Sequence, residues 1–133
     1  MKIVLDTNVL IAALIARGVC YELLEHCVLR HTLLTSDFIL EETQEKLIEK
    51  FGYTAELAAE AVTVLRSRMK VVPALKLDRP VCRDPDDDNI LAAAVSANCD
   101  CVITGDEDLL VLKASEGIDI LSPRDFLIKE KVD

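Results

Sequence analysis

Apolar positions along the chain follow two patterns: short uninterrupted runs, and longer stretches that repeat with the period of a helix. The runs are rich in Val, Ile and Leu, as are strands buried on both faces of a parallel sheet. They predict strands at Lys2–Leu5, Thr32–Thr35, Val71–Pro73, Cys101–Thr104 and Asp119–Leu121. The periodic stretches predict helices over Val9–Ala16, Tyr21–Leu29, Ala55–Met69, Glu107–Lys113 and Pro123–Lys129.

Residues that favour helix ends indicate two further helices. Ser36 or Asp37 is expected to cap a helix that ends at Phe51-Gly52. Another helix begins near Asp84-Pro85, after a loop or extended segment over residues 74–83. Asn98 suits the end of that helix, because asparagine tolerates the left-handed backbone often found there.

Strands that alternate with helices imply a parallel sheet covered on both faces. The fold class is therefore α/β. The chain of 133 residues shows no linker, repeat or low-complexity tract, so we expect residues 1–133 to form a single domain. The apolar run Ile3–Ile15 is interrupted by Asp6 and Asn8, is too short to span a bilayer and lacks a signal-peptide cleavage pattern. A cytoplasmic protein is expected.

The densest charge on the chain lies at Asp84–Asn89, where four carboxylates occupy five positions just before an apolar run. Asp84 suits the N-cap of a helix, and acidic side chains in a first turn face the positive end of the helix dipole. One cap and one dipole partner would satisfy that structural account. Four carboxylates repel one another, however, and charge packed this densely favours a bound cation.

The helical period distinguishes one of these carboxylates. At roughly 100° per residue, the apolar residues that follow Asn89 define one buried arc. Asp87 lies near the middle of that arc, and Asp88 lies about a quarter-turn away. Asp87 is therefore predicted to be a site residue and Asp84 mainly the cap, while Asp86 and Asp88 stay undecided.

Three other acidic residues are predicted to meet Asp87 at one edge of the sheet, since ligand sites in open α/β sheets lie beyond the carboxyl ends of strands. Asp6 directly follows the first strand, Asp106 follows another, and Glu42 lies two turns into the helix after the second strand. By helical count Glu42 is closer to the apolar arc of its helix than Glu41 is. A lone Asp after a strand is more often a turn former or a cap, but that account does not explain four acidic residues at one edge.

Buried like charges are costly unless a cation neutralises them, and hard divalent cations take oxygen ligands. A carboxylate cluster of this kind suits hydrolysis of a phosphodiester, in which one metal ion activates water and a second, if present, stabilises the leaving oxygen. The net charge of −9 argues against a protein that holds nucleic acid by bulk electrostatics. It does not exclude a metal-dependent enzyme, because bound cations reverse the local charge.

The cysteines and histidines give no sequence signal for a zinc site. The five cysteines form no Cys-x-x-Cys pair, and Cys20 and Cys27 share a helical face where core packing is expected. His26 and His31 stand at no metal-binding spacing relative to these cysteines. Both histidines are expected to face solvent or to cap a helix end.

Four segments, in order along the chain, resemble the motifs of a PIN domain: Leu5–Ile11, Ser36–Glu42, Asp84–Leu91 and Thr104–Leu110. The greatest likeness is to small stand-alone PIN proteins classed as toxins, relatives of VapC-type toxins, and it covers essentially the whole chain. The resemblance implies a Rossmann-like, three-layer fold with a parallel sheet of about five strands. It also implies a Mg²⁺- or Mn²⁺-dependent ribonuclease that acts on single-stranded or structured RNA.

The resemblance also assigns roles to particular residues. It gives the catalytic, metal-binding positions to Asp6, Glu42, Asp87 and Asp106. The supporting groups, which would orient ligands or water, are Asn8, Thr104 and Asp108. Glu41 remains the alternative to Glu42 as the second acid, because the two are adjacent and Thr43 stands where the family often has leucine.

A homodimer and inhibition by a cognate antitoxin are further implications of the resemblance. The apolar helices near Val9–Leu29 and Ala55–Met69 could supply such surfaces, although core packing explains most of their side chains equally well. Basic candidates for phosphate contact, which a solvated face would also explain, are Arg66, Arg68, Lys70, Arg79 and Arg83.

The leading hypothesis is thus a metal-dependent endoribonuclease, with the toxin of a toxin–antitoxin pair as its expected setting. One rival is a non-catalytic α/β module that binds a metal ion and a partner, which would show metal binding without turnover. Another is a phosphotransfer enzyme or receiver domain. The segment Asp6-Thr7-Asn8 weakens it, because aspartyl-nucleophile phosphatases carry a second Asp two residues after the first.

Overall fold

The computed structural model describes residues 1–73, 81 and 85–132, apart from the side chains of Pro85, Asp86 and Val132. In chain order the elements are β1 (Lys2–Leu5), α1 (Thr7–Ile15), α2 (Val19–Arg30), β2 (Thr32–Thr35), α3 (Asp37–Phe51), α4 (Ala55–Arg68), β3 (Lys70–Val71), α5 (Pro85–Ser96), β4 (Cys101–Ile103), α6 (Glu107–Leu110), β5 (Ala114–Ser115), β6 (Ile118–Leu121) and α7 (Pro123–Val132). The loop predicted over residues 74–83, apart from Val81, and the cap predicted at Asp84 lie outside the described residues.

Polar residues and a glycine cap the helices α3 and α5 at the positions that the sequence predicts. Ser36, rather than Asp37, is the N-cap of α3, because its Oγ accepts a hydrogen bond of 3.3 Å from the backbone N of Ile39. Gly52 ends α3 in the left-handed conformation, with φ of 70°. Asn98 follows α5 with φ of 52°, which confirms it as the residue at that helix end.

One six-stranded sheet runs through the molecule in the order β3-β2-β1-β4-β6-β5. Neighbouring strands from β3 to β6 in this order pair in parallel, and the edge strand β5 pairs with β6 in the antiparallel direction. The α/β fold class with a parallel sheet is confirmed. The antiparallel edge strand was not predicted, because β5 comprises only two residues.

The helix predicted over Glu107–Lys113 is shorter than expected, since α6 ends at Leu110. The chain then turns back through Lys113, which has φ of 59°. A tight hairpin follows in which Glu116 and Gly117, with φ of 53° and 78°, join β5 to β6. Positive φ at both central positions is the signature of the type I′ turn, which suits the twist of paired strands.

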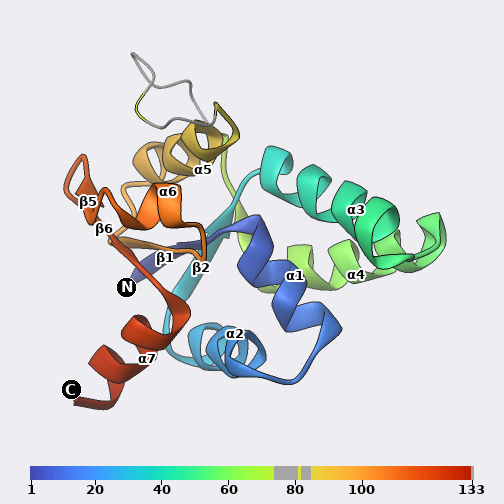
Figure 1. The fold of residues 1–133 in the computed structure, drawn as a ribbon, viewed down its shortest axis with the longest axis horizontal. Coiled ribbons are helices and arrows are strands. Elements are labelled where there is room, and N and C mark those ends of the chain that lie inside the picture. Colours follow the sequence, from blue (N-terminus) through green and yellow to red (C-terminus); the bar gives the residue numbers. More distant parts are fainter. Residues whose placement is uncertain (74–80, 82–84, 133) are drawn as a thin grey trace.

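The strand order creates a crevice at the centre of the sheet. From β1 the chain proceeds outward to β2 and β3, and then returns to the other side of β1 to form β4 and β6. Figure 1 shows α5 and α6 on one side of the sheet, and α2 with α7 on the other. The point where the order reverses, between β1 and β4, is where doubly wound sheets bind ligands beyond their carboxyl ends.

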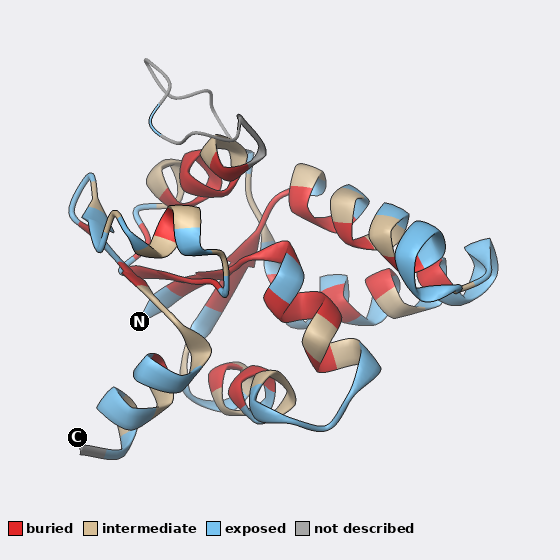
Figure 2. Ribbon diagram, viewed as in Figure 1, coloured by how far each residue is buried: buried red, intermediate tan, exposed pale blue. Residues whose placement is uncertain are grey.

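The main core lies between the central strands and the helices that cover them, and Figure 2 shows buried residues along these strands and on parts of the helices beside them. A smaller cluster joins α1, α3 and α4. Ile3, Val4 and Leu5 of β1 are at most 1% exposed, as expected of a strand covered on both faces. On α5 the apolar arc that includes Ile90 and Leu91 is buried against this sheet. Among the described helices no single one is long and apolar enough to cross a membrane, and only α1 and α2 taken together, bent by 106°, meet the criteria of length and composition.

The prediction for the two histidines is wrong in one respect. His31 does end α2, where its backbone N–H donates to the carbonyl of Cys27. The rings of His26 and His31, however, do not simply face solvent: both contact Glu130 of α7, which lies about 100 residues further along the chain. No local spacing in the sequence signals such a contact.

Candidate metal centre

Asp6 lies at the point where β1 ends and α1 begins. Its backbone N–H donates to the carbonyl of Ile103 in β4, at 2.9 Å, so the position is part of the sheet edge. Its carboxylate caps α1 by accepting a bond of 2.6 Å from the backbone N of Thr7. The other carboxylate oxygen accepts 2.6 Å and 3.3 Å bonds from the side chains of Thr104 and Asn8. Four groups therefore hold Asp6 in one orientation.

The end of β4 is tied to the same place through Thr104. Its hydroxyl donates to Asp6 and accepts a 2.9 Å bond from the backbone N of Asp106. The side-chain oxygen of Asn8 accepts a 3.3 Å bond from the backbone N of Gly105. Asn8 and Thr104, which were predicted as supporting groups, thus join the ends of β1 and β4 and position two of the predicted metal-binding carboxylates.

Asp106 also has a structural role of its own. Its Oδ1 accepts a 2.8 Å bond from the backbone N of Asp108 and caps α6. Asp6 and Asp106 are therefore both helix caps, as the structural account of these residues predicts. Capping engages one oxygen of each carboxylate. It leaves acceptor capacity for another ligand, because an ionised carboxylate has about four lone-pair sites.

The structure brings all four predicted acidic residues to one small cavity. A pocket with a volume of about 70 Å³ is lined by Asp6, Asn8, Glu42, Lys46, Asp87, Ile90 and Asp106. Asp87, in the first turn of α5, is only 6% exposed, as the helical period predicted. Glu42 of α3 is half-buried and faces the pocket, whereas Glu41 is exposed and does not line it. This placement favours Glu42 over Glu41.

Asp108, which is predicted as a supporting group, lies close enough to Asp87 and Asp106 to be a metal ligand itself. One carboxylate oxygen from each of Asp87, Asp106 and Asp108 lies within 4.8 Å of the others, so these three residues could hold a metal ion. Asp87 and Asp106 belong both to this group and to the pocket that Asp6 and Glu42 complete. Asp87 and Asp106 could therefore bind a metal ion in either group, whether the site holds one ion or two.

Lys46 was not foreseen. It stands four residues after Glu42 on α3, which places the two side chains on the same face of that helix. This spacing was the available signal, but it carries little weight alone, since pairs of this kind are common on solvated helices. Among the described residues that line the pocket Lys46 is the one basic residue, opposite four acidic ones.

The other candidates lie elsewhere. Arg66 pairs with Asp37 at 3.2 Å, and Arg68 lines a different cavity; neither lines the acidic pocket, and nor does Lys70. Arg79 and Arg83 lie outside the described residues.

Of the two undecided acidic residues, the side chain of Asp86 also lies outside the described part of the chain. Asp88 accepts bonds of 3.1 and 3.4 Å from the backbone N of Val81. It therefore ties Val81 to α5.

Burial raises the pKa of Asp6 above its ordinary value of 3.8, and the nearby charges of Glu42 and Asp106 raise it further. Hydrogen bonds from Thr104 and Thr7 oppose this shift. The net increase means that the protein resists ionisation of Asp6 when no cation is present. A divalent ion would remove that resistance. The donor set fits Mg²⁺ or Mn²⁺, since every acidic residue of the pocket offers oxygen ligands, which these hard cations prefer.

This pKa shift predicts how the metal-free protein responds to pH. Below pH 3.8 Asp6 carries a proton in both the folded and unfolded states; as the pH rises, the unfolded chain ionises first, so stability falls until the pH passes the folded pKa. Thermal unfolding in EDTA, followed upward from about pH 4, should therefore show the wild type losing stability relative to Asp6→Asn until the pH passes the folded pKa of Asp6. A difference in melting temperature that stays constant, or that shrinks, would contradict the prediction.

Comparison with known proteins identifies the family. A family model described as the PIN domain matches residues 2–108, which include both strand ends and both helices of the acidic pocket. The chain belongs to the PIN domain family. Among curated protein sequences, none matches the chain significantly.

Solved structures resemble this PIN domain at low sequence identity. VapBC2 from Rickettsia felis, bound to a DNA fragment from their promoter, has a TM-score of 0.69 at 17% identity and covers 92% of this chain and 98% of its own. VapBC-1 from nontypeable Haemophilus influenzae has a TM-score of 0.67 at 17% identity, over 93% and 99%. VapC20 of Mycobacterium tuberculosis, a sarcin-ricin loop cleaving toxin, has a TM-score of 0.61 at 17% identity, over 86% and 97%. These likenesses show a common fold.

Proposed function

We propose that this PIN domain is a Mg²⁺- or Mn²⁺-dependent endoribonuclease that hydrolyses phosphodiester bonds of single-stranded RNA. The observation that carries the proposal is the meeting of Asp6, Glu42, Asp87 and Asp106 around one pocket at the centre of the sheet. These residues come from four separate segments of the chain, so their convergence is not a consequence of local helix capping. Two buried and two half-buried carboxylates at this place suit a hard divalent cation.

The residues of the site have distinct tasks in such a reaction. A divalent ion bound here would supply positive charge to activate water and to stabilise the leaving oxygen. Asp6, Glu42, Asp87 and Asp106 would hold the ion, with Thr104 and Asn8 fixing the orientation of Asp6. One of the carboxylates of the pocket accepts the proton of the attacking water. Lys46, which lines the same pocket, would contact a phosphate of the substrate through its ammonium group.

We also propose a toxin–antitoxin setting, with an antitoxin protein and a second copy of the chain as partners. A cavity of about 570 Å³ lies between α1, α2 and α4, the helices whose apolar faces were expected to supply such surfaces. Two apolar side chains at its rim, Ile15 and Val64, are 44% and 52% exposed. Light scattering of the purified chain tests the homodimer: a monomer at micromolar concentration contradicts that part of the proposal.

The decisive experiment is cleavage of end-labelled RNA, single-stranded and hairpin, with Mn²⁺ and with EDTA, by the wild type and by Asp6→Asn. Asparagine caps helices as well as aspartate does, so this variant keeps the cap of α1 and removes a charged ligand. We expect cleavage by the wild type with Mn²⁺, and none with EDTA or with the variant. Metal-dependent cleavage that survives in Asp6→Asn would refute the assignment.

A different outcome would favour the non-catalytic alternative. If the wild type cleaves neither RNA while calorimetry shows that it binds Mn²⁺, a module that binds a metal ion and a partner fits better than a nuclease. Asp6→Asn should then weaken Mn²⁺ binding, while neither protein cleaves RNA.

A further inference from the structure

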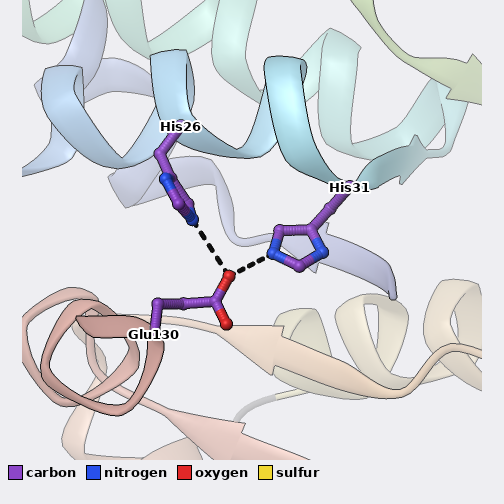
Figure 3. A group of neighbouring side chains, drawn as sticks. All are labelled: His26, His31 and Glu130. Atoms are coloured by element: carbon purple, nitrogen blue, oxygen red, sulfur yellow. Dashed lines mark hydrogen bonds and ion pairs between the residues drawn. The ribbon is translucent and has the colours of Figure 1, made fainter. Parts of the chain in front are cut away.

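A second group of ligand-forming side chains lies away from the acidic pocket. It comprises His26 of α2, His31 just after α2, and Glu130 of α7, and Figure 3 shows the three side chains pointing toward one another. Nε2 of His26 lies 2.9 Å from Oε1 of Glu130, and Nε2 of His31 contacts the same oxygen. One ligand atom from each residue lies within 4.8 Å of the others. None of the three lines the acidic pocket.

The rings are held in place by their surroundings. Phe126 of α7, which is fully buried, packs edge-on against both imidazoles, with ring centroids 6.5 Å from His26 and 5.8 Å from His31. The amine nitrogen of Met1 lies 3.0 Å from Nδ1 of His31, which leaves Nε2 to face Glu130. Side-chain exposure is 11% for His31 and 17% for Glu130, but 33% for His26, so one side of the group is open to water.

Two imidazoles and one carboxylate are a characteristic ligand set for Zn²⁺, in which water or another group takes the fourth position. Imidazole also selects transition metals over Mg²⁺ and Ca²⁺, which prefer oxygen. We propose that His26, His31 and Glu130 bind one Zn²⁺ ion that fastens α7 to α2. This site differs in ligand chemistry and in location from the proposed catalytic centre, so it does not depend on nuclease activity.

The nearby thiol of Cys27 is not part of the ligand set. The residues of this group whose ligand atoms lie within 4.8 Å of one another are His26, His31 and Glu130, and Cys27 is not among them. The alternative for the three side chains is a purely hydrogen-bonded group. That arrangement needs a proton on Nε2 of each imidazole, with Nδ1 of His31 accepting from the Met1 ammonium group. Metal binding needs both Nε2 lone pairs free, so Nδ1 of His31 would carry the proton and a deprotonated Met1 amine would accept from it. The two accounts therefore predict opposite responses to Zn²⁺.

An ion that binds only the folded chain raises its melting temperature. We would titrate the metal-free full chain with Zn²⁺ in excess Mg²⁺, following calorimetry and thermal unfolding. The wild type should bind one Zn²⁺ and gain roughly 10 °C at a Zn²⁺ concentration about 100 times the dissociation constant. His31→Gln and Glu130→Gln should lose this gain. Asp87→Asn, which alters only the acidic pocket, should keep it.

His26→Gln guards against a variant that fails to fold, because the His26 side chain is the most exposed of the three. Its melting temperature without metal should stay close to that of the wild type, while its response to Zn²⁺ disappears. Co²⁺ in place of Zn²⁺ should give the absorption bands of tetrahedral coordination in the wild type only. Three results would each overturn the proposal. They are no rise in the melting temperature of the wild type with Zn²⁺, a rise in His26→Gln and His31→Gln equal to that of the wild type, or loss of the rise in Asp87→Asn.

Discussion

Asp87→Asn should lower kcat/KM for Mn²⁺-dependent RNA cleavage by roughly 100- to 1,000-fold, about 3–4 kcal/mol of transition-state stabilisation. The substitution changes one oxygen to an amide nitrogen and removes one negative charge. Asp87 is among the most buried of the acidic residues in the pocket, and its carboxylate lies within 4.8 Å of those of Asp106 and Asp108. Loss of that charge weakens the hold on a divalent ion at the place where phosphate charge must be neutralised.

The same variant should not be less stable when metal is absent. Removing one of several like charges around a small pocket relieves repulsion, so in EDTA Asp87→Asn should melt at the same temperature as the wild type or higher. Added Mn²⁺ should then raise the melting temperature of the wild type more than that of the variant. A loss of cleavage accompanied by a lower melting temperature in EDTA would indicate damage to the fold instead.

Asp88→Asn is the matched control, since it makes the same chemical change at the next residue of α5. The carboxylate of Asp88 accepts from the backbone N of Val81, and asparagine can accept the same bond. Asp88 does not line the acidic pocket. Its substitution should change kcat/KM by no more than a few-fold. If Asp87→Asn and Asp88→Asn lose cleavage equally, the effect belongs to the acidic segment as a whole and not to one ligand.

The strands that were easiest to predict are those whose burial leaves a continuous apolar pattern. β1 and β2 occupy the residues expected, Lys2–Leu5 and Thr32–Thr35, because strands covered on both faces need apolar side chains on both. The hairpin of β5 and β6 shows the opposite case. Ala114–Ser115 is too short to carry a pattern, and the left-handed turn at Glu116-Gly117 depends on one glycine among ordinary residues.

The positions around the acidic pocket were predictable to the extent that the backbone determines them. Asp6 and Asp106 follow strands that lie side by side, and Asp87 follows from the helical period of α5. The inclusion of Lys46, and the approach of Asp108 to Asp87, depend on how α3, α5 and α6 pack together, which no local spacing encodes. The metal-binding role of all these residues remains a prediction that the proposed assays test.

The contact of His26 and His31 with Glu130 could not be predicted from the sequence, because it joins distant parts of the chain. Glu130 meets His26 and His31 across 104 and 99 positions of the chain, and only the docking of α7 on α2 brings them together. The spacing of histidines relative to cysteines says nothing about a carboxylate on a distant helix. A ligand set contributed by three separate segments becomes visible only in the folded chain.

Phe126→Ala should lower the free energy of unfolding by about 3–5 kcal/mol, the usual cost of removing a fully buried phenylalanine. Its side chain is 0% exposed and belongs to the main core, although it comes from the last helix of the chain. Urea unfolding in EDTA measures the change without any contribution from metal. Ile128→Ala is the control on the same helix: its side chain is 55% exposed, so the expected change is within about 0.5 kcal/mol.

Combining Phe126→Ala with Glu130→Gln tests how α7 is held. The ring of Phe126 packs against the two imidazoles that Glu130 contacts, so the two substitutions remove parts of one docking surface. Once Phe126→Ala has loosened α7, Glu130→Gln should cost less than it does alone, because a loosened helix no longer positions Glu130 against both histidines. Costs that add in full would mean that the apolar anchor and the His–Glu group stabilise the helix independently, and that α7 keeps its place on α2 without Phe126.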